Sequence, residues 1–268
     1  MVYQAYAVTH GGKIRSNNED NFYLNGDYRT DNSLFTFEAA SRSEQVVKAA
    51  VFDGIGGAEN GEVASYIAAG TMDETKKSLF GDELMSYINK ANRRILEAGK
   101  GKAMGSTCVI LSISNDMCWF SNVGDSRGYL LRNHTLKKMT KDHNLVTELY
   151  EQGLFTREQA MKHPDRHAIY QYLGMKDEDD VMVEPYEHTV FAAREGDWYL
   201  LCSDGLTDMV EEDRIREILD EEDIPVPGRE AEFLAKRLVD EALARGGRDN
   251  VTVVLIRAEG AQGVSDAV

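Results

Sequence analysis

Four short motifs place acidic side chains beside glycine or asparagine, and they lie at the ends of apolar, strand-like segments. The motifs are Arg15–Asp20, Val51–Gly57, Cys202–Gly205 and Gly247–Asn250. Carboxylates at strand ends, backed by tight glycine turns, suit a site for a hard cation with oxygen ligands. Arg15 suits a phosphate, because a guanidinium group can make two parallel hydrogen bonds to phosphate oxygens. Several carboxylates and one such arginine together indicate metal-assisted hydrolysis of a phosphoester.

The bulk composition limits the class of protein and its partners. A chain of 268 residues without a linker rich in proline or serine is long enough for one large domain with a full core. The formal net charge of -16 argues against nucleic acid or an anionic membrane as the main partner. Solubility alone would explain this charge, and so would a cluster of metal-binding acids; both explanations can hold.

The three cysteines, Cys108, Cys118 and Cys202, lie in apolar segments without regular spacing. This pattern predicts buried structural thiols rather than a disulfide framework or a zinc site. The N-terminal residues lack the basic start and apolar stretch of a signal peptide, and no segment reads as a membrane span. We therefore expect a cytoplasmic protein, and we expect it to be a monomer.

The hydrophobic pattern predicts strands and helices in an irregular order. Strands are expected at 2–9, 21–25, 46–52, 106–114, 117–123, 128–132, 135–139, 181–190, 198–202 and 251–256. Helices are expected at 62–80, 82–98, 145–161 with a break at Gly153, 211–219 and 230–244. Asp82 is the expected N-cap of the second helix, and the polar stretch 27–45 is expected to be a long loop or a mobile hairpin. This order fits packed antiparallel sheets with helices outside, not a parallel doubly wound sheet.

Together with three further motifs, the four motifs resemble the metal-dependent serine/threonine protein phosphatases of type 2C, and specifically their bacterial branch. The further motifs are Gly105–Thr107, Val123–Arg127 and Thr140–His143. The resemblance runs from Thr9 to Ile256. Each motif alone is weak, whereas the seven in order are specific to the family.

The resemblance implies the fold and the domain organisation. The implied fold is α+β: a four-layer α-β-β-α sandwich, in which two antiparallel sheets carry helices on both outer faces. The chain is then a single phosphatase domain over residues 1–258, with a frayed tail at 259–268. A flap at about 153–175 would lie beside the active site and affect the choice of substrate. The alternative for this segment is a plain pair of surface helices with one kink.

The resemblance also assigns ligands for a pair of Mn²⁺ or Mg²⁺ ions. Asp53 is expected to bridge both ions and to be catalytic, and the backbone carbonyl of Gly54 is expected to bind one of them. Glycine at position 54 lets the main chain approach an ion without a side chain in the way. Asp204 and Asp249 would complete the ligands of the first ion. An Asp before Gly is usually only a turn residue, so the metal interpretation depends on the whole set.

Further residues are expected around this pair. Asp20 and Glu19 would act mostly through waters on the ions, because Mg²⁺ and Mn²⁺ retain several waters. One such water, acidified by the ions, would be the nucleophile. Asn250 is expected to hold the metal-binding residues in position without itself contacting the ions. Arg15 is expected to bind the substrate phosphate; the alternative is a surface ion pair between Arg15 and Glu19.

A third, weaker ion is implied between Asp125 and Asp204. The alternative for Asp125 is a structural ion pair with Arg127. No firm chemical role follows for His143, which could cap the helix after it.

Two departures from the family pattern bear on the mechanism. Ile55 stands where some members carry a histidine that could protonate the leaving alkoxide, so here the proton must come from elsewhere. His10 stands where relatives often carry Asp, close to the loop that leads to Arg15. The stretch 27–45 is also longer than expected for the bacterial branch.

The resulting hypothesis is a protein-serine/threonine phosphatase that acts on phosphorylated proteins, with a cognate Ser/Thr kinase as a further partner implied by the bacterial branch. A catalytically silent relative that binds phosphoproteins would have lost a metal acid, and Asp20, Asp53, Asp204 and Asp249 are all present. A structural calcium protein would need dense acidic loops, which the sequence lacks.

Overall fold

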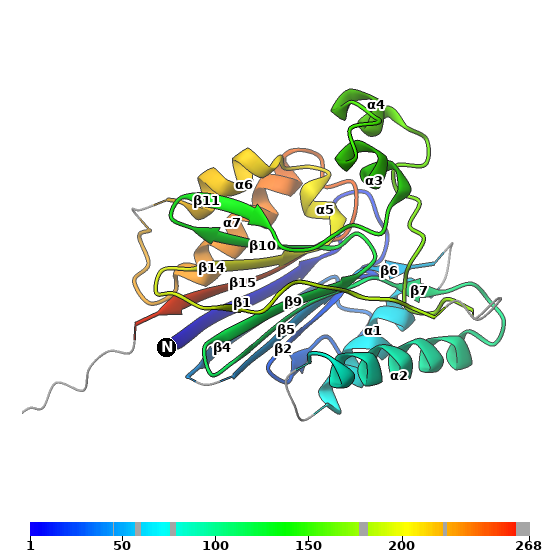
Figure 1. Cartoon of the computed structure of the whole chain (residues 1–268), viewed down its shortest axis with the longest axis horizontal. Helices are drawn as coiled ribbons and strands as arrows, with labels where there is room; N and C mark the ends of the chain where they lie inside the picture. The colour runs from blue at the N-terminus through cyan, green and yellow to red at the C-terminus, as the bar shows by residue number, and fades with distance from the viewer. Residues whose placement is uncertain (45, 57–59, 76–78, 177–181, 222–223, 261–268) are drawn as a thin grey trace, which may run out of the picture.

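The computed structural model describes residues 1–44, 46–56, 60–75, 79–176, 182–221 and 224–260. Two large antiparallel sheets lie face to face, with helices against their outer faces (Figure 1). The predicted α+β sandwich is therefore confirmed. The assignment of 1–258 to one domain with a flap stays a prediction, and most of the expected tail, 261–268, lies outside the described residues.

The first sheet has six strands in the order β11-β10-β14-β15-β1-β4. Their bounds are Thr135–Lys138, Arg127–Arg132, Trp198–Cys202, Val251–Glu259, Val2–His10 and Thr36–Ser43. Helices α6 (Glu212–Leu219) and α7 (Glu230–Ala244) pack on its outer face through an apolar layer that includes Tyr6, Val8 and Leu238. Alternate residues of β1, such as Ala5 and Ala7, face the second sheet instead. Successive side chains of β1 therefore point to opposite faces of the sheet, and both faces are buried.

The second sheet follows the order β12-β9-β8-β5-β2-β3, with β13 paired to β9. The bounds are Tyr186–Glu187, Met117–Val123, Cys108–Ser114, Val46–Phe52, Asn21–Leu24, Asp27–Tyr28 and, for β13, Phe191–Ala192. Helices α1 (Gly61–Asp73) and α2 (Asp82–Gly99) cover its outer face. Val51 points into the layer between the sheets, whereas Ala50 and Phe52 point to the helices.

Short elements gather at one end of the sandwich. The small ladder of β6 (Gly54–Ile55) and β7 (Gly105–Ser106) lies there, as does α5 (Asp204–Thr207). Helices α3 (Leu145–Glu151) and α4 (Arg157–Lys162) project from the same end, away from the sheets (Figure 1). The sheets are therefore the rigid support, and this end carries the loops.

Several expected elements differ in the structure. The stretch 27–45 is not simply a loop: it contains β3 and β4, and β4 pairs with β1 from Thr36 opposite His10 to Ser43 opposite Tyr3. The stretch is polar in composition, but Thr36–Ser43 form an edge strand in which exposed and half-buried residues alternate. The helix expected at 62–80 ends at Asp73, and within the described part of 181–190 only β12 is a strand.

Candidate active site

The predicted metal acids come from five different connections and meet at this end of the sandwich. Asp53 follows β5, Asp204 opens α5 after β14, and Asp249 precedes β15. Asp20 directly precedes β2, and Asp125 lies between β9 and β10. The pKa of Asp53 is raised well above its usual value, first by burial and then by the charges of the other four acids. The structure therefore brings all five predicted carboxylates within electrostatic reach of one another.

Burial and mutual repulsion disfavour the charged form of Asp20, Asp53, Asp125 and Asp204. Burial is the largest cause that raises the pKa of Asp20, to about 7; the hydrogen bonds from Thr252 and Ser203 partly oppose it, and the charges of Asp204 and Asp249 add a smaller increase. The pKa of Asp204 is raised to about 6 by burial and then by the charges of Asp208 and Asp249. Several negative carboxylates buried close together raise the free energy of the folded state unless a cation neutralises them. This donor set, made of oxygens alone, fits Mn²⁺ or Mg²⁺ rather than a softer metal.

Hydroxyl groups hold Asp20 in place. Its Oδ2 accepts hydrogen bonds from Ser203 Oγ at 2.8 Å and from Thr252 Oγ1 at 2.7 Å. Ser203 lies in the Cys202–Gly205 motif, which also supplies Asp204, and Thr252 lies in β15, two residues after the Gly247–Asn250 motif. A carboxylate fixed by two donors keeps one orientation, which a metal site needs.

Asp53 is fixed through its backbone. Its N–H donates to Thr107 Oγ1 at 3.1 Å, and its carbonyl accepts from the Thr107 N–H at 2.8 Å. The Thr107 hydroxyl also lies 2.7 Å from Ser126 Oγ, next to Asp125. The motif that contains Thr107 thus connects the segments of two predicted ligands.

Gly54 lies where no other residue fits. A Cβ atom there would lie 2.3 Å from the Gly61 carbonyl oxygen and 2.5 Å from the Glu19 carbonyl oxygen. Because both neighbours are backbone atoms, they cannot rotate away. This packing accounts for the glycine independently of any metal, and the binding of an ion by its carbonyl stays a prediction.

Asn250 holds the loop that carries Arg15. Its Oδ1 accepts from the Glu19 N–H at 2.7 Å, and its Nδ2 donates to the carbonyls of Gly11 at 3.0 Å and Asn17 at 2.8 Å. His10 shapes the start of the same loop, since its Nδ1 accepts from the N–H of Gly12 at 2.9 Å. This arrangement matches a supporting role for Asn250.

Arg15 itself pairs with a predicted ligand. Its Nη2 donates to Asp249 Oδ2 at 2.6 Å, so the ion pair that forms is with Asp249 rather than with Glu19. The Arg15 side chain is 52% exposed. The guanidinium therefore lies at the mouth of the acid cluster, in reach of solvent and of an incoming anion.

Asp125 does not form the ion pair considered as the alternative. Arg127 donates instead to Asp142 Oδ2, from Nε at 2.9 Å and from Nη2 at 2.7 Å. The pKa of Asp125 is raised, first by burial and then by the charge of Asp204. Asp125 therefore belongs electrostatically to the acid cluster.

His143 does not cap the helix after it, contrary to expectation. The N-cap of α3 is Asn144, whose side chain accepts from the N–H groups of Val146 and Thr147. His143 Nδ1 accepts instead from the Gly124 N–H at 3.1 Å. It thus fixes the turn that precedes Asp125. Similarly, the N-cap of α2 is Gly81, and Asp82 is the first helical residue.

Two residues near the cluster had no role in the sequence analysis. His167, within the predicted flap, lies with Nδ1 3.9 Å from Asp204 Oδ2 and with Nε2 3.7 Å from Asp208 Oδ2. One potential ligand atom from each of these three residues lies within 4.8 Å of the others. Asp208 lies one turn after Asp204, because its N–H donates to the Asp204 carbonyl at 2.8 Å, but the four-residue helix α5 between them has no signal in the sequence. The approach of His167 depends on the tertiary fold.

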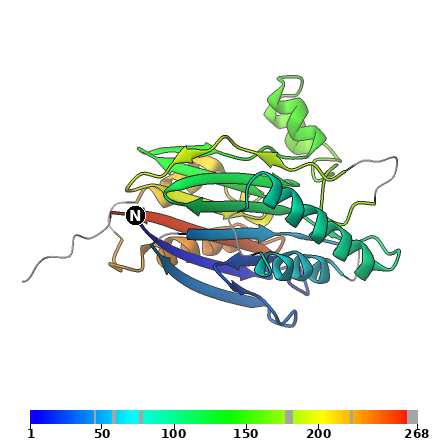
Figure 2. The ribbon, with the colours of Figure 1, turned by 60° about the horizontal axis from the view of Figure 1, so that its bottom comes forward.

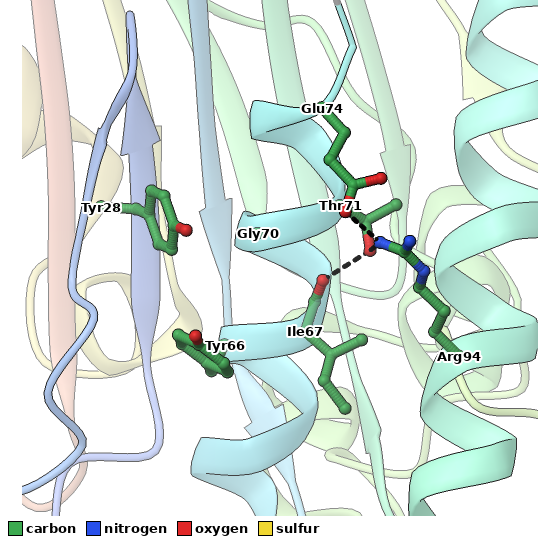
Figure 3. Close-up of a pocket in the computed structure, with 7 residues that line it drawn as sticks. All are labelled: Tyr28, Tyr66, Ile67, Gly70, Thr71, Glu74 and Arg94. Atoms are coloured by element: carbon green, nitrogen blue, oxygen red, sulfur yellow. Dashed lines mark hydrogen bonds and ion pairs between the residues drawn. The ribbon is translucent and has the colours of Figure 1, made fainter.

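A separate pocket lies between β3, α1 and α2 (Figure 3). Tyr28 and Tyr66 line one side, and Arg94 reaches in from the other. Arg94 Nη1 donates to Thr71 Oγ1 at 3.2 Å and to Glu74 Oε1 at 2.7 Å. Its charge is already compensated, and the pocket contains none of the predicted site residues. The acid cluster is therefore the better candidate for an active site.

Comparisons with known proteins agree with this site. Residues 5–149 match the family model for protein phosphatase 2C. A Listeria monocytogenes protein named serine/threonine phosphatase Stp is 34% identical over 273 residues, which cover 97% of each chain. The chain belongs to the protein phosphatase 2C family. The predicted family and enzyme class, a protein serine/threonine phosphatase, are therefore confirmed.

Solved structures extend the similarity over nearly the whole phosphatase. The S. agalactiae serine/threonine phosphatase has a TM-score of 0.77 and 30% identity, and the match covers 96% of this chain and 100% of that one. The catalytic domain of the phosphatase PstP in complex with two manganese ions has a TM-score of 0.75 and 32% identity, with coverage of 97% and 100%. The predicted dependence on divalent metal ions, Mn²⁺ or Mg²⁺, is confirmed at the level of the family, whereas the individual site residues stay predictions.

None of the helices within the described ranges is long and apolar enough to cross a membrane.

Proposed function

We propose that the acid cluster of this phosphatase is its active site and that it hydrolyses phosphoserine and phosphothreonine monoesters on proteins. One observation carries the proposal: five carboxylates from separate segments converge, and burial and mutual repulsion raise the pKa of Asp53. Such an arrangement is unfavourable without divalent cations and favourable with them. Two core ions, Mn²⁺ or Mg²⁺, fit the donor set.

Asp53, Asp204 and Asp249 hold the core ions, together with the carbonyl of Gly54. When bound, the ions provide a nucleophilic water at neutral pH and offset the charge of the phosphate. Asp20 and Glu19 orient the surrounding waters; the hydrogen bonds from Ser203 and Thr252 to Asp20 support this role.

Arg15 binds and orients the phosphate. Its side chain is 52% exposed, so an anion can reach the guanidinium beside its contact with Asp249, and a fork of N–H groups matches two phosphate oxygens. A phosphate that approaches Arg15 meets the acid cluster directly behind it, because Arg15 already contacts Asp249. The substrate is thereby directed toward the core ions.

Asp125 and Asp204 would hold a weaker third ion. Support comes from the raised pKa of Asp125, of which the charge of Asp204 is the second cause after burial. Fewer acids surround this place than surround Asp53. Ile55 in β6 offers no proton to the leaving alkoxide, so a water held at Asp125 would supply it.

The partners are phosphorylated proteins, and we extend the proposal to a cognate Ser/Thr kinase and to a cytoplasmic location. The net charge of -16 disfavours nucleic acid and anionic membranes. The three free cysteines are all buried, which suits a reducing compartment.

The test is phosphate release from a phosphothreonine peptide with Mn²⁺, with Mg²⁺ and with a chelator, and a phosphotyrosine peptide is the control. We expect release from phosphothreonine with either metal and none after chelation. Binding of the peptide without phosphate release under any metal would instead identify a catalytically silent relative.

A further inference from the structure

Strand β4 forms an open edge of the first sheet. It comes last in the strand order and pairs only with β1, over eight residues without a bulge. Figure 2 shows it along the lower border of the sandwich. Natural edge strands are usually protected by charged residues, lysine above all, by proline, by a bulge or by a short length. Residues Thr36–Ser43 carry two charges of opposite sign, Glu38 and Arg42, but no lysine, proline or bulge.

The register shows which backbone groups face the open side. The N–H of Gly11 donates to the Phe35 carbonyl at 2.9 Å, so Phe35 and every second residue after it turn their polar groups toward β1. Thr36, Glu38, Ala40 and Arg42 therefore turn their N–H and C=O groups away from β1. Their side chains are all exposed, whereas those of the residues between them are half-buried.

The sequence of this edge is complementary to itself in an antiparallel arrangement. A two-fold axis at Ala40 sets Glu38 of one copy opposite Arg42 of the other, twice. The small Ala40 side chains meet at the axis and leave the strands free to approach. Opposite charges directly across a strand pair are favourable, and like charges are unfavourable.

Neighbouring charges support the same pairing. Within one chain Glu38 already accepts from Lys236, with Oε2 and Nζ 3.0 Å apart, and Arg42 Nη2 pairs with Glu259 Oε2 at 2.8 Å. In the dimer, the Lys236–Glu38 pair of one copy would lie beside the Arg42–Glu259 pair of the second copy. The four side chains would then form a row in which positive and negative charges alternate. Glu38 and Arg42 each keep their present partner and gain one across the axis.

Apolar side chains lie at both ends of the edge. Leu34 and Phe35, just before β4, are 39% and 40% exposed, and Val46, the first residue of β5 in the second sheet, is 43% exposed. The two-fold rotation brings the N-terminal end of β4 in one copy close to the C-terminal end of β4 in the other copy. These exposed groups then approach each other, which matters because a pair of strands alone is only marginally stable in water.

We propose that two copies of this chain form a symmetric dimer through antiparallel pairing of their β4 strands, which replaces the monomer expected from the sequence. The two first sheets then make one continuous sheet. The Thr36 end of β4 lies beside His10, which leads into the Arg15 loop. The two active sites therefore lie at opposite ends of the joined sheet, and both stay open to phosphoproteins.

The test is sedimentation velocity over a concentration series at about 0.15 M salt, where the repulsion between two acidic chains is screened beyond about 8 Å. We expect a wild-type dimer. Ala40→Pro removes only an N–H that faces the open edge, and proline is tolerated on edge strands. It should raise the dimer dissociation constant at least about tenfold while thermal stability and aryl phosphate hydrolysis are unchanged.

Charge variants test the register itself. Glu38→Arg alone sets Arg opposite Arg, and Arg42→Glu alone sets Glu opposite Glu, so each variant should be monomeric. A one-to-one mixture of the two should form the heterodimer, because every cross-strand pair is then of opposite sign. Glu97→Arg and Arg93→Glu on α2 are the matched controls and should remain dimeric.

Three results would each overturn the proposal. The first is a wild-type chain that stays monomeric at all concentrations. The second is a dimer that survives Ala40→Pro, which would assign it to another face. The third is a mixture of the two charge variants that stays monomeric.

Discussion

Arg15 donates to Asp249 across 2.6 Å, so the residue proposed to bind phosphate contacts a residue proposed to bind metal. The other Asp249 oxygen, Oδ1, accepts from the Asn250 N–H at 2.9 Å. Both carboxylate oxygens are thus engaged by the protein. A cation that binds Asp249 and a phosphate that binds Arg15 both replace part of the Arg15–Asp249 ion pair. The binding of metal and the binding of substrate are therefore coupled.

Removal of the Arg15 side chain should separate these two functions. Arg15→Ala loses a charge-assisted contact worth about 1.5–3 kcal/mol, so we expect KM for an aryl phosphate to rise about 10- to 150-fold. The Mn²⁺ concentration for half-maximal activity should not rise, because Asp249 is released from a competing partner. Arg15→Lys keeps the charge without the fork and should be intermediate. An unchanged KM with a higher Mn²⁺ requirement would make Arg15 a structural residue.

Loss of Asp125 should depend on the leaving group. Asp125→Ala keeps Asp53, Asp204 and Asp249, so tight Mn²⁺ binding measured by calorimetry should persist. An alkoxide needs a proton as it leaves, whereas an aryl oxide needs little. We therefore expect turnover on a phosphothreonine peptide to fall by at least about tenfold more than turnover on an aryl phosphate. Equal losses on both substrates would argue against a role in proton supply.

The stability of the protein in chelator should fall as pH rises. The pKa of Asp20 is raised to about 7 and that of Asp204 to about 6. The folded state therefore holds protons that the unfolded chain releases near pH 4. This contribution to stability is complete below about pH 4 and is lost as pH rises through about 7.

The melting temperature in chelator between about pH 5 and 8 measures this effect. Asp20→Asn should make the fall of the melting temperature with pH less steep than in the wild type. His10 and His143, whose pKa values are lowered chiefly by burial, contribute in the opposite direction, but they contribute equally to both proteins and so do not affect the comparison. Mn²⁺ should also remove the decline, because metals bind the ionised carboxylates. A wild-type melting temperature that rises over this range in step with Asp20→Asn would contradict the prediction.

Gly54 should not tolerate a side chain. Gly54→Ala forces a methyl group against two backbone carbonyls, so we expect a loss of about 1–3 kcal/mol of unfolding free energy, with loss of activity. Gly70→Ala in α1 is the matched control, since its Cβ would meet Tyr28 only at 3.7 Å and alanine favours a helix. Denaturant unfolding of both variants measures the difference, and equal stability of the two would refute the packing argument.

Elements with strong local signals could be predicted from the sequence. Helix α7 occupies the predicted residues 230–244, because its apolar periodicity is clear. The β8–β9 hairpin follows from the turn residues Asn115 and Asp116, which adopt the left-handed conformation. Strand β4 was missed because an edge strand needs little apolar sequence, and α5 was missed because four residues are too few for a helical period.

The composition of the candidate site could be predicted, but not its contacts. Family motifs identify the acids, and the structure brings them together. The contact of Arg15 with Asp249 joins residues 234 positions apart, and the approach of His167 to Asp204 depends on how α3 and α4 sit at the end of the sandwich. No local pattern encodes such distances, which are set by the packing of the two sheets.

Mn²⁺ binding by Asp53 variants tests the central claim most directly. Calorimetry on the wild type should show at least two Mn²⁺ sites per chain, and Asp53→Asn should lose the tight sites together with phosphothreonine hydrolysis. Asp31→Asn is the matched control, because Asp31 lies on an exposed loop and bonds to Ser33; it should behave as the wild type. If Asp53→Asn kept wild-type Mn²⁺ stoichiometry and turnover, the acid cluster would not be the metal centre of this phosphatase.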